Sequence, residues 1–107
     1  MARTDNARSY TEAKHEAWAD VEGADPVTVQ DRRFLPGRIC VTYDWRTQLG
    51  DTRWSLRSVV LSGPWVDADG TPTGAGSGNV LLLMSDAPDW ARQFATDNVP
   101  RTALVEQ

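Results

Sequence analysis

The sequence predicts an α+β fold: an antiparallel four-stranded meander with one N-terminal and one C-terminal helix, both packed on the same face of the sheet. Residues 38–46 and 53–61 alternate apolar and polar side chains with a period of two, as half-buried strands do. Residues 9–22 and 86–98 repeat apolar side chains at helical spacing. The predicted order of elements is therefore α-β-β-β-β-α, with a layer of helices on a layer of strands.

The first predicted element is a helix over residues 9–22. Ser9 and Glu12 have the spacing of a capping box, in which each side chain accepts a hydrogen bond from the other residue's backbone N–H. Apolar side chains then recur every three or four residues. Gly23 can adopt the left-handed conformation that ends a helix, and Pro26 cannot continue one.

The four predicted strands occupy residues 27–31, 38–46, 53–61 and 80–84. The second and third strands should form a hairpin, because the connection between them is short and contains Gly50-Asp51. Unbroken alternation in the third strand assigns one shared face to Trp54, Leu56, Ser58 and Val60. The continuous apolar run at residues 80–84 predicts a buried central strand.

The segments that follow the hairpin are less regular. Pro64 has no N–H for a central ladder, so the third strand either stops at an edge or continues past a bulge to residue 66. Residues 67–78 are rich in glycine and turn formers and are predicted to form a mobile loop. Ser85 or Asp86 then caps the last helix.

Size and composition favour one soluble domain. The chain has 107 residues and a net charge of −4, and we expect a domain at residues 9–100 between a flexible N-terminus at 1–8 and a tail at 101–107. It contains neither an apolar run of the roughly 18 residues that cross a bilayer nor a secretory signal. One cysteine excludes an internal disulfide. We therefore expect an acidic cytoplasmic protein with no membrane partner.

The charge is distributed in blocks. Residues 1–31 sum to −4, residues 32–57 to +4 and residues 58–107 to −4. If the two long strands pair as predicted, one outer face gathers Arg38, Arg46, Arg53 and Arg57. These four residues, the candidate basic face, could bind an anionic partner, or the acidic flanks could fold back and neutralise them.

No residue pattern indicates catalysis. His15 begins a zinc-protease motif, but the sequence has no second histidine. Cys40 has only His15 as a potential base, and nothing in the sequence places the two together. Asp67 and Asp69 open like a calcium loop, but Gly78 stands where that loop needs a glutamate, so an Asp-Gly turn explains the same residues. We predict no catalytic residue, no metal site and no cofactor, with weak calcium binding at the two aspartates as the alternative.

Residues 32–100 carry a family resemblance. It rests on the sequence VLSGP at residues 60–64, on the glycine-rich connection, and on APDWA at residues 87–91. With these features the chain resembles a type of small actinobacterial or actinophage protein. The resemblance implies such an origin and implies no activity or site residue.

The functional hypothesis is a non-catalytic interaction or regulatory protein of phage origin that binds a protein partner, because tryptophan and arginine are the commonest hot-spot residues of interfaces. Self-association into a homodimer through a sheet edge is also open. One alternative is nucleic-acid binding on the candidate basic face, although Trp45 and Trp54 fall on the opposite, apolar face. Another is a small-ligand or enzymatic domain with a pocket between sheet and helices, lined by Tyr10, Tyr43, Trp18 or Trp90.

Overall fold

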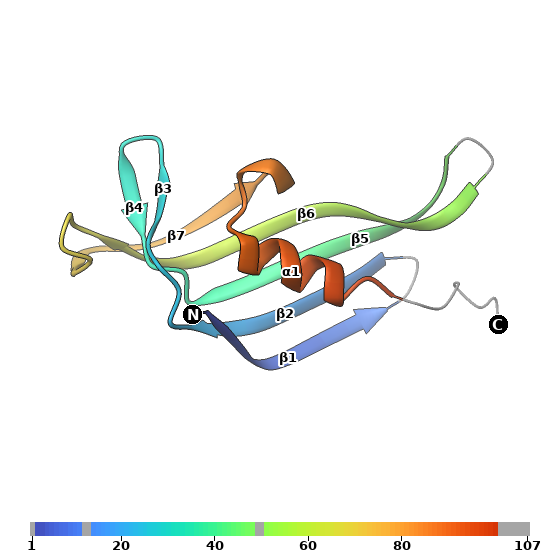
Figure 1. Ribbon diagram of the computed structural model, residues 1–107, viewed down its shortest axis with the longest axis horizontal. Coiled ribbons are helices and arrows are strands. Elements are labelled where there is room, and N and C mark those ends of the chain that lie inside the picture. The colour runs from blue at the N-terminus through green and yellow to red at the C-terminus, as the bar shows by residue number, and fades with distance from the viewer. Residues whose placement is uncertain (1, 12–13, 49–50, 101–107) are drawn as a thin grey trace.

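The computed structural model describes residues 2–11, 14–48 and 51–100, without the side chains of residues 5–11, 46–48, 51–52 and 75. The predicted turn residue Gly50 and the predicted tail at 101–107 lie outside the described residues. Within these residues, seven strands form one curled antiparallel sheet, and one helix covers one of its faces (Figure 1). The predicted four-stranded meander with two helices is therefore wrong.

The strands are β1 Arg3–Thr11, β2 Lys14–Glu22, β3 Val27–Val29, β4 Arg32–Phe34, β5 Arg38–Gln48, β6 Asp51–Val66 and β7 Pro72–Leu82. A 3-10 turn, η1 (Met84–Asp86), leads to the helix α1 (Asp89–Asp97). The strand order is β1-β2-β5-β6-β4-β3, and β7 pairs with the other side of β6.

The predicted N-terminal helix is replaced by the antiparallel hairpin of β1 and β2. Alternate side chains of β2 are buried, namely His15, Ala17, Ala19 and Val21. Apolar residues four positions apart, such as Ala17 and Val21, fit a helix, but they also fit a strand because four is a multiple of two. Pairing of β2 with β5 decides between the two. β1 begins at Arg3, inside the segment that the sequence assigned to a flexible N-terminus.

The central hairpin of β5 and β6 is confirmed, but the predicted assignment of β6 side chains to the two faces of the sheet is not. Between Thr42 and Tyr43 the partner residue in β6 jumps by two positions, so Arg57 is the extra residue of a β-bulge. Beyond the bulge the buried set shifts by one residue. Val59 is 1% exposed, whereas Val60, which the sequence assigned to the face of Trp54, lies on the opposite face. The predicted unbroken alternation is therefore wrong.

β6 continues through Pro64, as the second of the two alternatives predicted. β4 and β5 lie along the same side of β6, and the short connection between them keeps the ladder intact. The N–H of Leu35 donates to the carbonyl of Pro64 at 2.9 Å, and the N–H of Gly37 donates to Ser62 at 2.8 Å. A Cβ on Gly63 would lie 1.8 Å from the carbonyl oxygen of Leu35, so only glycine permits this close approach.

β7 corrects two predictions. The segment 67–78, predicted to be a mobile loop, is mostly strand, because β7 begins at Pro72. The run at 80–84 is not a buried central strand, because within the described residues β7 pairs with β6 alone and forms an edge. Leu81 is 69% exposed and Leu83 is 71% exposed.

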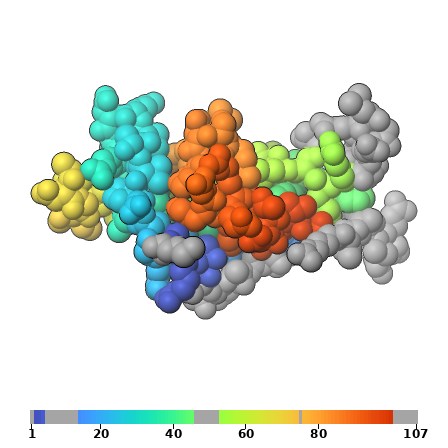
Figure 2. All heavy atoms as spheres, in the orientation of Figure 1, coloured from blue at the N-terminus to red at the C-terminus, as the bar shows by residue number. Residues whose placement is uncertain are grey.

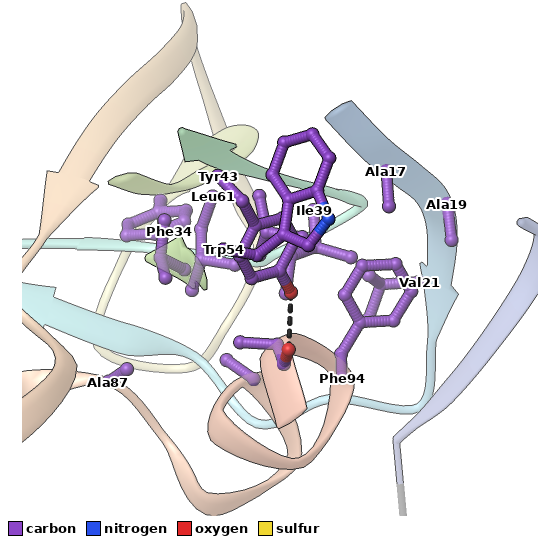
Figure 3. Packing of buried hydrophobic residues seen from close by; sticks show 14 residues of the cluster. Ala17, Ala19, Val21, Phe34, Ile39, Tyr43, Trp54, Leu61, Ala87 and Phe94 are labelled. Atoms are coloured by element: carbon purple, nitrogen blue, oxygen red, sulfur yellow. Dashed lines mark hydrogen bonds between the residues drawn. The ribbon is translucent and has the colours of Figure 1, made fainter. Parts of the chain in front are cut away.

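The core lies between α1 and the sheet face beneath it. The predicted C-terminal helix is confirmed, but Pro88 is its N-cap residue, and the predicted cap at Ser85 or Asp86 is wrong because these residues belong to η1. The buried side chains of α1 are Ala91, Phe94 and Ala95. The hydroxyl of Tyr43 in β5 donates to the carbonyl oxygen of Ala95, and Figure 3 shows this bond joining sheet to helix. The carbonyls of the last helical turn have no partner within the helix, so Tyr43 satisfies one of them and fixes where α1 sits.

Candidate binding groove

A groove runs between α1 and the chain that leads from β2 to β3, and its volume is about 690 Å³. On the face shown in Figure 2, residues 23–27 (light blue to cyan) and the region of α1 (orange to red) lie side by side. Its lining residues are Ala2, Thr4, Gly23, Ala24, Asp25, Pro26, Val27, Pro88, Asp89, Trp90, Gln93, Phe94, Asp97 and Asn98. A groove of this volume accommodates a drug-sized molecule or a short segment of a protein.

One wall of the groove is a face of α1. Trp90 and Phe94 are four residues apart and therefore lie one above the other on the helix surface. Phe94 is buried and packs into the core, and Trp90 is half-buried at its border. Gln93 and Asp97 form a neighbouring row at the same spacing, and the Gln93 Nε2 donates to the Asp97 Oδ1 at 2.7 Å. This wall therefore presents aromatic surface beside polar groups.

The opposite wall is the bend between β2 and β3. Gly23 has a φ of 74°, a conformation that costs glycine nothing, and Pro26 holds the chain extended towards β3. Ala24 and Val27 are half-buried against the core, and Asp25 between them is exposed. The bend thus adds apolar side chains to the groove and a carboxylate to its rim.

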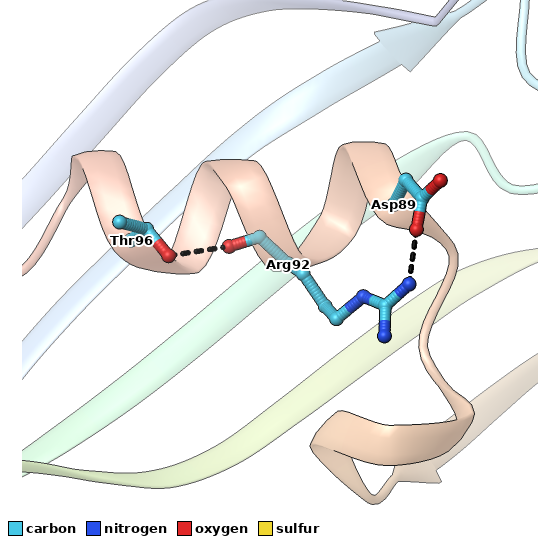
Figure 4. A network of polar contacts seen from close by, with 3 residues as sticks. All are labelled: Asp89, Arg92 and Thr96. Atoms are coloured by element: carbon cyan, nitrogen blue, oxygen red, sulfur yellow. Dashed lines mark hydrogen bonds and ion pairs between the residues drawn. The ribbon is translucent and has the colours of Figure 1, made fainter.

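The groove is acidic. Its carboxylates belong to Asp25, Asp89 and Asp97, and neither lysine nor arginine occurs among the described residues that line it. Arg92, on the neighbouring face of α1, donates to Asp89 (Figure 4). One of the three negative charges is thus paired from outside the groove, and the local charge stays negative.

The four residues of the candidate basic face are spread along the two long strands. The register places Arg46 directly opposite Arg53 near the end of the β5–β6 hairpin. The side chain of Arg46 lies outside the described part of the structure, and that of Arg53 is exposed. Arg57 is the residue of the bulge, and Arg38 lies eight positions from Arg46 along β5.

Acidic side chains lie among these arginines. Asp20 is directly opposite Arg38 in the β2–β5 ladder. The Arg57 Nη1 lies 3.7 Å from the Asp44 Oδ1. The outer face therefore has mixed charge, with a carboxylate from β2, which belongs to the acidic N-terminal flank, and another from β5 itself.

His15 and Cys40 lie on opposite faces of the sheet. His15 is buried, with its ring centroid 5.7 Å from that of Tyr43 and 6.0 Å from that of Trp54, and burial lowers its pKa. The Cys40 Sγ faces the other way, 3.9 Å from the Glu16 Oε1. Burial, and then the charge of Glu16, raise the pKa of the thiol. The two residues therefore cannot act as a nucleophile–base pair.

The segment from Asp67 to Thr71, which resembles the opening of a calcium loop in sequence, forms a turn. The Asp67 Oδ1 accepts hydrogen bonds from the backbone N–H groups of Asp69, at 2.9 Å, and Thr71, at 3.0 Å. Gly70 has the positive φ, 81°, that completes the turn. Across the part of the chain that the structure describes, no group of three or more His, Cys, Asp or Glu residues could hold a metal ion.

The described aromatic residues named for a pocket do not line one groove together. Trp90 lines the groove, Tyr43 is buried beneath α1, and Trp18 lies on the outer face opposite Cys40. The side chain of Tyr10 is not among those described. Sequence reasoning missed the wall around Asp25, because Gly23 and Pro26 indicate only that an element ends there.

Among the described helical residues, none forms a helix with the length and apolarity needed to span a membrane. Comparisons of the chain with protein families, with curated proteins and with solved structures find no match.

Proposed function

We propose that this protein is a cytoplasmic, non-catalytic interaction domain that binds a partner protein by taking a short basic and apolar segment of that partner into the groove beside α1. The observation that carries the proposal is that one groove of about 690 Å³ combines aromatic surface from Trp90 and Phe94 with three carboxylates, and has neither lysine nor arginine among its described lining residues. An apolar side chain would fill the groove, and a neighbouring lysine or arginine would face the carboxylates.

The chemistry of the groove favours recognition rather than turnover. Its carboxylates lie at the rim, where they orient a cation without being brought together as an acid–base pair. Trp90 offers a broad apolar surface to a partner. Because its side chain is already half-buried, it loses little conformational entropy on binding. These are properties of an anchor for a partner side chain.

A peptide array tests the proposal directly. Each peptide carries one leucine or aromatic residue flanked by two lysines, and matched peptides carry glutamates in place of the lysines or glycine in place of the apolar residue. We expect binding only when both features are present, with a Kd of about 10–100 μM, as is common for a single short anchor. Preference for the glutamate-flanked peptides would contradict the proposal.

Two pairs of variants locate the site. Trp90→Ala should weaken binding by about 30-fold or more, as for a hot-spot tryptophan. Trp18→Ala, which truncates a half-buried tryptophan on the other face of the sheet, should leave affinity unchanged. Asp25→Lys should weaken binding by about 5-fold or more, whereas Asp69→Lys, in the exposed turn before β7, should have no effect.

A further inference from the structure

Strand β7 carries more apolar surface than its place in the sheet can bury. Residues 80–84 are continuously apolar, a pattern typical of strands that are covered on both faces. In the structure Val80 and Leu82 pack against the core, whereas Leu81 and Leu83 are 69% and 71% exposed. They are the two most exposed large apolar side chains that the structure describes.

The edge of β7 is also open for pairing. Within the described residues β7 pairs with β6 and with no other strand, so backbone N–H and C=O groups on its outer side lack a strand partner. The first half of β7 is protected, because it contains Pro72 and because Gly74 and Gly76 have positive φ angles of 81° and 94°. Residues 79–84 contain no proline, glycine or charge that would block pairing.

We propose that this edge pairs with the same edge of a second copy of the chain, giving a symmetric antiparallel homodimer through residues 79–83. A two-fold axis at Leu81 would pair residues 79–83 of the two copies, with the two Leu81 side chains opposite each other and each Leu83 diagonal to Leu81 of the other copy. Both leucines would then be covered on the outer face, and the sheet would continue from one copy into the next.

The distribution of charge favours a second copy of the chain as the partner of the β7 edge. From Pro72 to Leu82, β7 carries no ionisable side chain, so a charged partner strand would gain nothing there. The other long edge, β1, carries Arg3, Asp5 and Arg8, which would be desolvated against the leucines of β7. β3 is only three residues long. Of the sheet edges formed by the described residues, β7 matches only itself.

The size of this edge predicts a weak dimer. Five paired residues span roughly 17 Å of strand, which places the interface at the small end of specific protein contacts. We therefore expect association with a Kd of about 100 μM and rapid exchange between monomer and dimer.

Sedimentation equilibrium of the full chain from about 10 μM to about 1 mM measures this association. We expect the average mass to rise from monomer towards dimer. Leu81→Lys should weaken association at least about tenfold, because each copy would place one charge against the apolar edge of the other. Val99→Lys, at an exposed apolar residue after α1, should associate like the unmodified chain.

Hydrogen exchange supplies an independent measurement. Backbone amides at residues 79–83 should exchange more slowly at high than at low protein concentration, in the unmodified chain and in Val99→Lys only. Leu83→Lys replaces Leu81→Lys if circular dichroism shows that the first variant is unfolded. A monomer across the whole series, growth beyond a dimer, or association that these lysines leave unchanged would overturn the proposal. Protection confined to β1 or to the groove would do the same.

Discussion

Among the described glycines, Gly63 has the least space for a side chain. An added Cβ would lie 1.8 Å from the carbonyl oxygen and 2.8 Å from the carbonyl carbon of Leu35. These are backbone atoms held by the hydrogen bonds between β6 and the β4–β5 connection, so they cannot move aside without breaking the ladder. We predict that Gly63→Ala lowers the free energy of unfolding by about 3 kcal/mol or more.

Gly37→Ala is the matched control, because its added Cβ would meet its nearest atom, the Ser62 carbonyl oxygen, at 3.9 Å. This is an ordinary contact distance, and we expect a change of about 0.5 kcal/mol or less. Urea unfolding of both variants measures the difference. Equal stability of the two would contradict the close approach of the chains at Gly63.

His15 makes stability depend on pH in a window where little else titrates. Burial lowers its pKa below the ordinary value of 6.5, so the unfolded chain binds the imidazole proton more readily than the folded protein. The contribution of neutral His15 is therefore complete above about pH 6.5 and declines as the pH falls from there towards the lowered folded pKa. We predict falling stability between about pH 7 and pH 5.

His15→Gln should flatten this part of the profile, because His15 is the only histidine of the sequence. Thermal unfolding followed by circular dichroism at several pH values gives the comparison. If the variant kept the same slope between these pH values, the dependence would belong to the carboxylates rather than to His15.

At the scale of elements, α1 is joined to the sheet by Tyr43. Tyr43→Phe leaves the buried carbonyl of Ala95 without its donor, and we predict a loss of about 1–3 kcal/mol, or about 5 °C or more in Tm. Thr96→Ala removes a hydroxyl that donates to the Arg92 carbonyl on the exposed side of the same helix, and should change stability by about 0.5 kcal/mol or less. Differential scanning calorimetry compares the two; similar losses would mean that Tyr43 does not anchor the helix.

The elements that could be predicted from sequence are those whose periodicity has one interpretation. The β5–β6 hairpin and α1 are of this kind. The β1–β2 hairpin is not, since Ala17 and Val21 satisfy both a helical and a strand period, and only pairing with β5 removes the ambiguity. The bulge at Arg57 has no local signal either, because it is defined only by the pairing of β6 with β5.

Only one wall of the groove could be predicted from the sequence. Trp90 could be named from the sequence as a pocket residue, since it begins an amphipathic helix. Its opposite wall around Asp25 comes from a distant part of the chain, and the two walls meet only in the folded protein. Likewise, the exposure of Leu81 in β7 and of Leu83 directly after it follows from the position of that strand at an edge, which the apolar pattern alone does not predict.

At the scale of the whole molecule, the distribution of charge argues against nucleic acid. The arginines of the outer face alternate with Asp20 and Asp44, and the net charge of the chain is −4. We predict negligible binding to random single- and double-stranded oligonucleotides at low salt. Fluorescence anisotropy across a salt series measures it. Affinity that fell with a logarithmic slope of about −0.7 to −0.9 per phosphate contact, and that decreased on replacing Arg53 and Arg57, would contradict this prediction.

Protein–partner recognition through the groove is tested most directly by two-dimensional NMR of the ¹⁵N-labelled chain during titration with the best lysine-flanked peptide from the array. We predict that the amides that shift belong to residues 23–27 and 88–98, the two walls of the groove, and that the outer face around Arg38 and Arg53 stays unchanged. Shifts concentrated on the outer face, or the absence of shifts from both walls at saturation, would contradict the account.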